Sequence, residues 1–241
     1  MSVPRSTGSL RPLALPLLTL AVGSLALIWG AASLGSGAVA DDLRELEARL
    51  LRFSSFSTAF TKQTLEQTPE RDVSACDTHS QHALMLLEIP IADAALRSGD
   101  GLDYDRHVDS LEARTRHVLG CSPRDSLAWL VAFGLQIQHG VLNERSFGLL
   151  AMSYETSPHE AWIAVRRTAV AVPILLSASP AVQSRILDEF ETLVRHGFLQ
   201  MPARAYAKAS PAARILLDSR INNLDSARRR EFSEAVKQVR S

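Results

Sequence analysis

An uncharged stretch near the N-terminus, Pro12–Ala40, constrains the fold of this chain more than any other feature. Its most apolar part, Leu13–Leu34, would be about 33 Å long as a helix, at about 1.5 Å per residue. The hydrocarbon layer of a bilayer is about 30 Å thick. Residues 12–34 are therefore predicted to form one transmembrane helix.

Charged residues on the two sides of this segment predict its orientation. Arg5 and Arg11 precede it, whereas Asp41 and Asp42 follow it. Because positive charge stays on the cytoplasmic side of a membrane, residues 1–11 are expected in the cytoplasm. Arginine also greatly outnumbers lysine, which is typical of a GC-rich bacterial genome. We therefore expect a single-pass protein of a bacterial inner membrane whose C-terminal domain is periplasmic.

A cleaved signal peptide is the alternative to a retained anchor. Ala38-Val39-Ala40 before Asp41 matches the small-residue pattern of a signal peptidase site, so cleavage after Ala40 stays open. The apolar core is longer than that of an ordinary signal peptide, and its densest part ends near Trp29. These two observations favour the retained anchor, and either process exports the domain.

Composition excludes several classes of function. The chain has 26 basic and 26 acidic residues, so no strong field attracts nucleic acid, and no nucleic-acid partner is expected. The small basic clusters Arg166-Arg167 and Arg228-Arg229-Arg230 are expected on solvated helix faces. The sequence predicts no cofactor.

The two cysteines, Cys76 and Cys121, are predicted to form a disulfide because the periplasm is oxidising. Two free thiols are one alternative. A zinc site is another, since His79 and His82 follow Cys76 at spacings that metal ligands use. The disulfide is the simplest of the three, and no metal site is predicted.

The chain after the anchor has the apolar spacing of helices, and no long window alternates with a period of two, so no sheet is expected. Four Ser-Pro pairs are predicted to start helices, because Ser caps free amides and Pro fits the first helical position. Glu160, three residues after Ser157, adds a capping box to the second pair. The pairs begin at Ser122, Ser157, Ser179 and Ser210. The predicted helices are 41–66, 79–97, 105–119, 124–139, 143–155, 158–176, 180–196, 211–222 and 225–239.

Residues 35–66 are expected to form a linker and a membrane-proximal helix, followed by a loop over residues 67–78. Leu43, Leu46 and Leu50 recur at helical spacing in this segment. They are expected to pack on their own domain, with a homodimer through residues 43–60 as the alternative.

Part of residues 67–241 resembles a degenerate tetratricopeptide repeat unit. Trp129, Gly140, Ala151 and Pro158 follow the order of a first helix, a glycine turn, a second helix and a terminal proline. The resemblance implies stacked α/α hairpins. The expected fold is therefore all-α, an N-terminal transmembrane helix followed by a TPR-like domain.

Five residues of this domain are candidates for a binding groove. Aromatic residues of a helical repeat form its core in most cases, but one or two can line a concave groove where a peptide or glycan stacks. The candidates are Trp129, Phe133, Tyr154, Trp162 and Arg166.

An enzyme is the less favoured interpretation. Residues 197–203 resemble a stretch of lytic transglycosylases, which cleave glycans with one glutamic acid whose pKa is raised. In that family a Ser follows the acid, whereas Glu189 and Glu155 here are followed by Phe and Thr. No G-x-S-x-G motif of a serine hydrolase occurs either. No catalytic residue is therefore assigned.

A single-pass anchor followed by a helical domain resembles accessory proteins of bacterial envelope and exopolysaccharide assembly. This resemblance implies a membrane-anchored periplasmic scaffold that binds protein partners in the membrane or periplasm and is not an enzyme. A peptidoglycan- or glycan-cleaving enzyme is the alternative.

Overall fold

The computed structural model describes residues 11–52, 56–68 and 73–240, without the side chains of 11–16 and 31–38. Every regular element in these residues is a helix, which confirms the all-α class. The helices are α1 (Arg11–Leu51), α2 (Thr58–Gln67), α3 (Thr78–Ser98), α4 (Gly101–Cys121), α5 (Ser126–Gln138), α6 (Glu144–Thr156), α7 (Ala161–Ala171), the 3-10 helix η2 (Val172–Ser177), α8 (Pro180–Arg195), α9 (Gln200–Lys208), α10 (Pro211–Ile221) and α11 (Ser226–Arg240).

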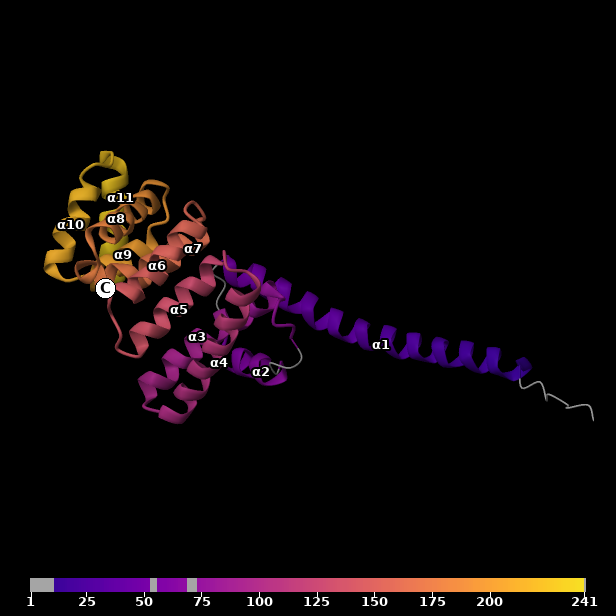
Figure 1. The fold of residues 1–241 in the computed structure, drawn as a ribbon. Coiled ribbons are helices and arrows are strands. Elements are labelled where there is room, and N and C mark those ends of the chain that lie inside the picture. Colours follow the sequence, from indigo (N-terminus) through magenta and orange to yellow (C-terminus); the bar gives the residue numbers. More distant parts are fainter. Residues whose placement is uncertain (1–10, 53–55, 69–72, 241) are drawn as a thin grey trace, which may run out of the picture.

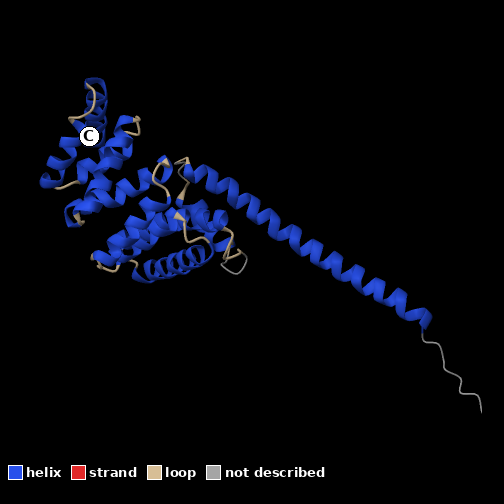
Figure 2. Ribbon diagram, turned by 45° about the horizontal axis from the view of Figure 1, so that its top comes forward, coloured by secondary structure: helices blue, strands red, loops and turns tan. Residues whose placement is uncertain are grey.

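Helix α1 is one continuous element that extends far beyond the other helices (Figure 1). It runs without a break through residues 35–40, which were expected to belong to a linker. The second view shows the same long projection from a helical body (Figure 2). All side chains of residues 17–30 are exposed to solvent. Their large apolar members are Leu17, Leu18, Leu20, Val22, Leu25, Leu27, Ile28 and Trp29.

Within the part of the chain that the structure describes, no helix is both long enough and apolar enough to span a membrane. The transmembrane span predicted over residues 12–34 is therefore not found there. That prediction falls partly on residues 12–16 and 31–34, whose side chains lie outside the described set.

The C-terminal part of α1 packs against α3. Leu43 and Leu46 are buried in a small core with Ala83, Leu84 and Leu87 of α3. This is the packing on their own domain that the sequence favoured, and these two leucines are not exposed for a dimer interface. The homodimer through residues 43–60 stays a prediction.

The predicted helix over residues 41–66 is in fact two helices. Helix α1 ends at Leu51 and α2 begins at Thr58, after the N-cap Ser57, whose hydroxyl accepts a hydrogen bond from the Phe60 amide. Ser57 interrupts the apolar spacing, and its preference for a cap explains why a new helix starts there. Of the loop predicted over residues 67–78, residues 69–72 lie outside the described set.

The body is a stack of helices around one main core. Helices α3 and α4 pack as one hairpin, and α5 and α6 pack as the next, with the turn at Gly140. The main core draws apolar side chains from both hairpins and from α7 to α11. The α5–α6 hairpin is the unit that resembles a tetratricopeptide repeat, but the packing alone identifies no repeat family.

Two of the four Ser-Pro pairs start helices. Ser179 and Ser210 are the N-caps of α8 and α10, each followed by Pro at the first helical position. Ser122 and Ser157 instead end α4 and α6, so the prediction was wrong there. The predicted capping box at Ser157 is absent, since Glu160 is the N-cap of α7 and makes no side-chain capping bond.

Two further boundaries differ from the expected ones. Helix α4 begins at Gly101 because Asp100 caps it, its carboxylate accepting from the Asp103 amide at 3.1 Å. Helix α9 was not predicted at all, since the helices expected on either side of residues 197–203 were 180–196 and 211–222. Only the first part of that stretch is a turn, centred on Gly197.

The predicted disulfide is present. Cys76, just before α3, is bonded to Cys121 at the end of α4, with a Cα–Cα distance of 5.4 Å. The bond closes the hairpin that α1 packs against. Cys76 is therefore not a metal ligand, and no group of three metal-binding side chains occurs in the described part of the chain.

Candidate functional site

The five predicted groove residues do not line one groove. Phe133 is fully buried in the main core, with its ring centroid 6.0 Å from that of Phe147. The indole N–H groups of Trp129 and Trp162 donate to local acceptors, the Pro123 carbonyl and the Glu160 carboxylate. Tyr154 alone lines a cleft.

Arg166 has a structural role at the end of α1. Its guanidinium donates to the Leu50 carbonyl at 2.8 Å and to the Trp162 carbonyl at 2.7 Å. Burial lowers the pKa of Arg166 to about 10, so it stays a cation at neutral pH. A cation at the last carbonyls of a helix is favourable, and Arg166 thereby ties α7 to α1.

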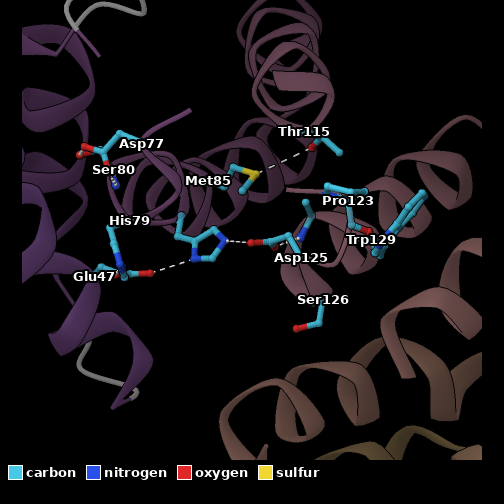
Figure 3. Close-up of polar contacts among 12 residues, drawn as sticks. Glu47, Asp77, His79, Ser80, Met85, Thr115, Pro123, Asp125, Ser126 and Trp129 are labelled. Carbon is cyan, nitrogen blue, oxygen red and sulfur yellow. Dashed lines mark hydrogen bonds and ion pairs between the residues drawn. The ribbon is translucent and has the colours of Figure 1, made fainter. Parts of the chain in front are cut away.

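A charged triad fixes the same end of α1 to α3 and α5. The His82 ring lies between two carboxylates, with Nδ1 2.8 Å from Glu47 Oε1 and Nε2 2.6 Å from Asp125 Oδ2 (Figure 3). Glu47 also contacts His79 Nδ1 at 2.6 Å, and Asp125 caps α5 by accepting from the Ala128 amide. We call Glu47, His82 and Asp125 the α1 triad.

The α1 triad carries a positive charge on His82 at neutral pH. Burial favours the neutral ring, but the hydrogen bonds and charges of Asp125 and Glu47 outweigh burial and raise the pKa of His82 to about 9. Both ring nitrogens therefore donate to carboxylates.

A cleft of about 720 Å³ lies between α6, α7 and α8. We call it the α6–α8 cleft. It combines charged side chains with apolar and aromatic ones. Its lining residues are Tyr154, Glu155, Pro158, His159, Ala161, Ala164, Arg185, Asp188, Glu189, Thr192, Leu193, His196 and Phe198.

The inner wall of the cleft contains a buried ion pair. Arg167 is fully buried and donates to the Ser153 carbonyl at 2.7 Å, the Ser157 carbonyl at 3.0 Å and both oxygens of Glu189. Burial raises the pKa of Glu189, and the bonds from Arg167 act in the opposite direction. Because both carboxylate oxygens are occupied by a cation, Glu189 is poorly suited to donate a proton to a substrate.

Tyr154 lies against this pair. The Arg167 guanidinium is 4.5 Å from the centroid of its ring. Burial and the charge of Glu189 raise the pKa of Tyr154 well above its ordinary value, so the hydroxyl stays protonated. This hydroxyl interacts with the Glu189 carboxylate, which acts on its pKa, but it makes no close hydrogen bond within the described residues. Ser157 Oγ is the other buried side-chain oxygen near this pair without a close hydrogen bond.

The mouth of the cleft is more exposed. Both terminal nitrogens of Arg185 lie 3.3 Å from Glu155 Oε1, and both side chains are about half exposed. His159 and His196 also line the cleft, and the Phe198 ring is 43% exposed. Charged groups, a hydroxyl and aromatic faces thus surround one open volume, an arrangement that suits binding of a polar ligand.

Sequence reasoning missed the central residue of this site. Arg167 was expected on a solvated helix face, but it is the largest fully buried side chain of the described chain. Arg167 directly follows Arg166, and the two were expected on the same solvated surface. Neighbouring residues of a helix point about 100° apart, so one of them can be buried more deeply than the other. Ser153 and Glu189, which bind Arg167, are far from it in sequence and gave no local signal.

Comparison of the chain with protein-family models, curated proteins and solved structures finds no match.

Proposed function

We propose that this protein is a membrane-attached helical scaffold, an accessory component of bacterial envelope or exopolysaccharide assembly, whose periplasmic body binds a protein partner. The observation that carries the proposal is the division of α1 into two unlike parts. One part exposes only uncharged and mainly apolar side chains, and the other is fixed to the body by the α1 triad, by Arg166 and by buried leucines.

The exposed part of α1 is the reason to propose membrane attachment. Eight large apolar side chains are solvent-exposed within residues 17–30. A soluble surface rarely carries so much contiguous apolar area, and such a surface marks contact with a membrane or another protein. No charged residue interrupts the sequence from Pro12 to Ala40, which favours the membrane.

The body supports the binding part of the proposal. Its helices pack as successive hairpins, as in α-helical repeat proteins, which use their extended surfaces to bind partners. The α6–α8 cleft provides an open volume among them. The resemblances to a tetratricopeptide repeat and to envelope-assembly accessory proteins point to the same class of function.

Membrane attachment is tested with the full chain carrying a C-terminal reporter that is active only in the periplasm. The wild type should fractionate with the inner membrane, resist carbonate extraction and give reporter activity. Leu20→Asp combined with Leu27→Asp should abolish membrane retention, because a charge in the hydrocarbon layer costs about 2.5–3.5 kcal/mol per residue on insertion scales. The matched control is Leu176→Asp, at an exposed leucine of the body. A wild type found in the soluble fraction would refute the attachment.

Partner binding is tested by photocrosslinking in living cells. A crosslinker at His159, at the cleft, should give a discrete product with one membrane or periplasmic protein. The same group at Ile215, which is 70% exposed on α10, should not. Identical products from both positions would argue against a specific partner at the cleft.

A glycan-cleaving enzyme is the second candidate, and one observation favours it. Glu155 and Glu189 line the same cleft, and burial raises the pKa of Glu189. The bonds from Arg167 to Glu189 weigh against it. Clearing of purified peptidoglycan by the wild type, lost in Glu189→Gln or Glu155→Gln, would replace the scaffold with an enzyme.

A further inference from the structure

We propose that the α6–α8 cleft binds a neutral carbohydrate. This inference adds a ligand class to the protein, and it rests on the proposed function only in treating the cleft as a binding site. It is carried by the charge balance of the cleft, by the exposed ion pair at its mouth and by an exposed aromatic ring in its lining.

Each carboxylate of the cleft has an arginine partner. The pairs are Glu155 with Arg185, Asp188 with Arg220 at 2.9 Å, and Glu189 with Arg167. The charges of these three pairs therefore cancel, and Arg220 also lies 3.6 Å from Glu191, which pairs with Arg195. A cationic or anionic ligand would lose its hydration without gaining an unpaired counter-charge, whereas a neutral polar ligand avoids that penalty.

The groups at the mouth match the hydrogen bonding of sugar hydroxyls. A hydroxyl donates one hydrogen bond and accepts others, so it needs acceptors and donors side by side. Glu155 supplies acceptors and Arg185 supplies donors. Both terminal nitrogens of Arg185 lie 3.3 Å from Oε1 of Glu155. The described contacts of this pair do not use Oε2, so Oε2 is left to accept from a sugar hydroxyl.

The deeper wall offers one further group of the same kind. The Tyr154 hydroxyl is protonated and buried next to Glu189, and it makes no close hydrogen bond within the described residues. A buried hydroxyl gains from any acceptor that reaches it, and ring oxygens and hydroxyl oxygens of a sugar are acceptors. Thr192 on α8 adds another hydroxyl to the lining.

Phe198 supplies an apolar face. It follows Gly197, whose φ of +86° ends α8, and its amide donates to the Leu193 carbonyl at 3.0 Å. This is the hydrogen bond of a glycine C-cap motif, so the backbone fixes Phe198 at the cleft although its ring is 43% exposed. The C–H face of a pyranose ring can pack on such a ring, beside the apolar Leu193 and Pro158.

The volume fits a short oligosaccharide. The cleft measures about 720 Å³ and lies within the range of about 300–1,000 Å³ typical of small-molecule sites. An extended peptide is the competing occupant. A peptide with basic residues is disfavoured, because it would need an unpaired acidic charge that this cleft lacks.

The test uses the full chain in a zwitterionic detergent without sugar groups and saturation-transfer NMR. The neutral probes are the tetrasaccharides of N-acetylglucosamine, β-linked glucose and α-linked glucose. The charged controls are the tetramer of glucosamine and that of galacturonic acid, which keep the ring and add charge. A decapeptide rich in Lys and Arg is the peptide control.

At least one neutral tetrasaccharide should bind, and the charged tetramers should bind at least about tenfold more weakly. Phe198→Ala should weaken that binding at least about fivefold, and Glu155→Ala should do the same, while Leu176→Ala should not. Circular dichroism of each variant checks the fold, which these exposed positions do not support.

The inference is overturned if no neutral probe binds, if a charged tetramer binds more tightly, or if Phe198→Ala leaves binding unchanged. Binding of the peptide with the same dependence on Phe198 would also overturn it, but would leave the scaffold standing. Loss of membrane fractionation would refute the attachment while leaving the sugar site standing, so the two failures can be told apart.

Discussion

Replacing His82 with Gln should make the stability of the body depend on pH in a specific way. His82 is only 13% exposed and carries its proton between Glu47 and Asp125, which raise its pKa from 6.5 to about 9 against the effect of burial. Because the folded pKa is above the unfolded one, the stabilisation is fully present below about pH 6.5. It is lost as the pH rises through about 9.

The magnitude follows from the size of the shift. Each pKa unit corresponds to about 1.4 kcal/mol, so a rise from 6.5 to about 9 contributes about 3 kcal/mol to the free energy of unfolding at low pH. About 2 kcal/mol should remain near pH 7.5, and less than about 0.5 kcal/mol above pH 9. In His82→Gln the same two carboxylates stay buried without a cation, which costs a comparable amount.

The assay is urea unfolding of the full chain in detergent, followed by tryptophan fluorescence between about pH 6 and pH 10. The difference in unfolding free energy between the wild type and His82→Gln should be largest near pH 6 and should vanish near pH 10. His79→Gln is the matched control, because His79 binds the same Glu47 but is largely exposed. A difference that is independent of pH, or that disappears around pH 6.5, would refute the role assigned to His82.

Four further predictions concern other parts of the body. Reducing the Cys76–Cys121 disulfide should lower the free energy of unfolding by about 3–4 kcal/mol, since it closes a loop of 45 residues, and non-reducing mass spectrometry of exported protein should find no free thiol. Arg167→Met should cost about 3–5 kcal/mol in the same urea assay, because it leaves a buried carboxylate without its cation, and a cost below about 1 kcal/mol would contradict that account. Gly197→Ala should cost about 1 kcal/mol, since φ is +86° there and the added Cβ would lie 3.2 Å from an arginine nitrogen. Gly148→Ala, in an exposed helix interior with nothing within 4 Å, should instead stabilise by about 0.5–1 kcal/mol in thermal melts.

The sequence predicted the parts of the fold that depend on local chemistry. Apolar helix spacing, the glycine turn at Gly140 and the disulfide are local or arithmetic signals, and the structure has the turn and the disulfide where they were predicted. The Ser-Pro starts failed at Ser122 and Ser157, and a better cap a few residues further on explains the first of these failures. At the first of these, Asp125 caps α5 and also binds His82, which no local pattern reveals.

The candidate site was less predictable for a related reason. Tyr154 and the two glutamates could be identified by residue type, but their convergence depends on how α6, α7 and α8 pack. Arg167 shows the limit most clearly. A charged residue in a basic pair is ordinarily solvated, and only its long-range partners Ser153 and Glu189 make burial tolerable.

The way α1 is fixed to the body explains how a scaffold of this kind could keep a defined orientation. Leucine packing alone would tolerate small rotations of a helix, because apolar contacts are not directional. The α1 triad is directional: Glu47 reaches His82 from only one azimuth, and a shift of α1 by one residue would turn Glu47 by about 100°. Arg166 at the Leu50 carbonyl fixes the axial position as well. Since α1 is continuous from Arg11 to Leu51, these contacts set the direction in which its exposed apolar part leaves the body. A membrane that takes up that part would therefore hold the body, and the α6–α8 cleft with it, at a fixed angle.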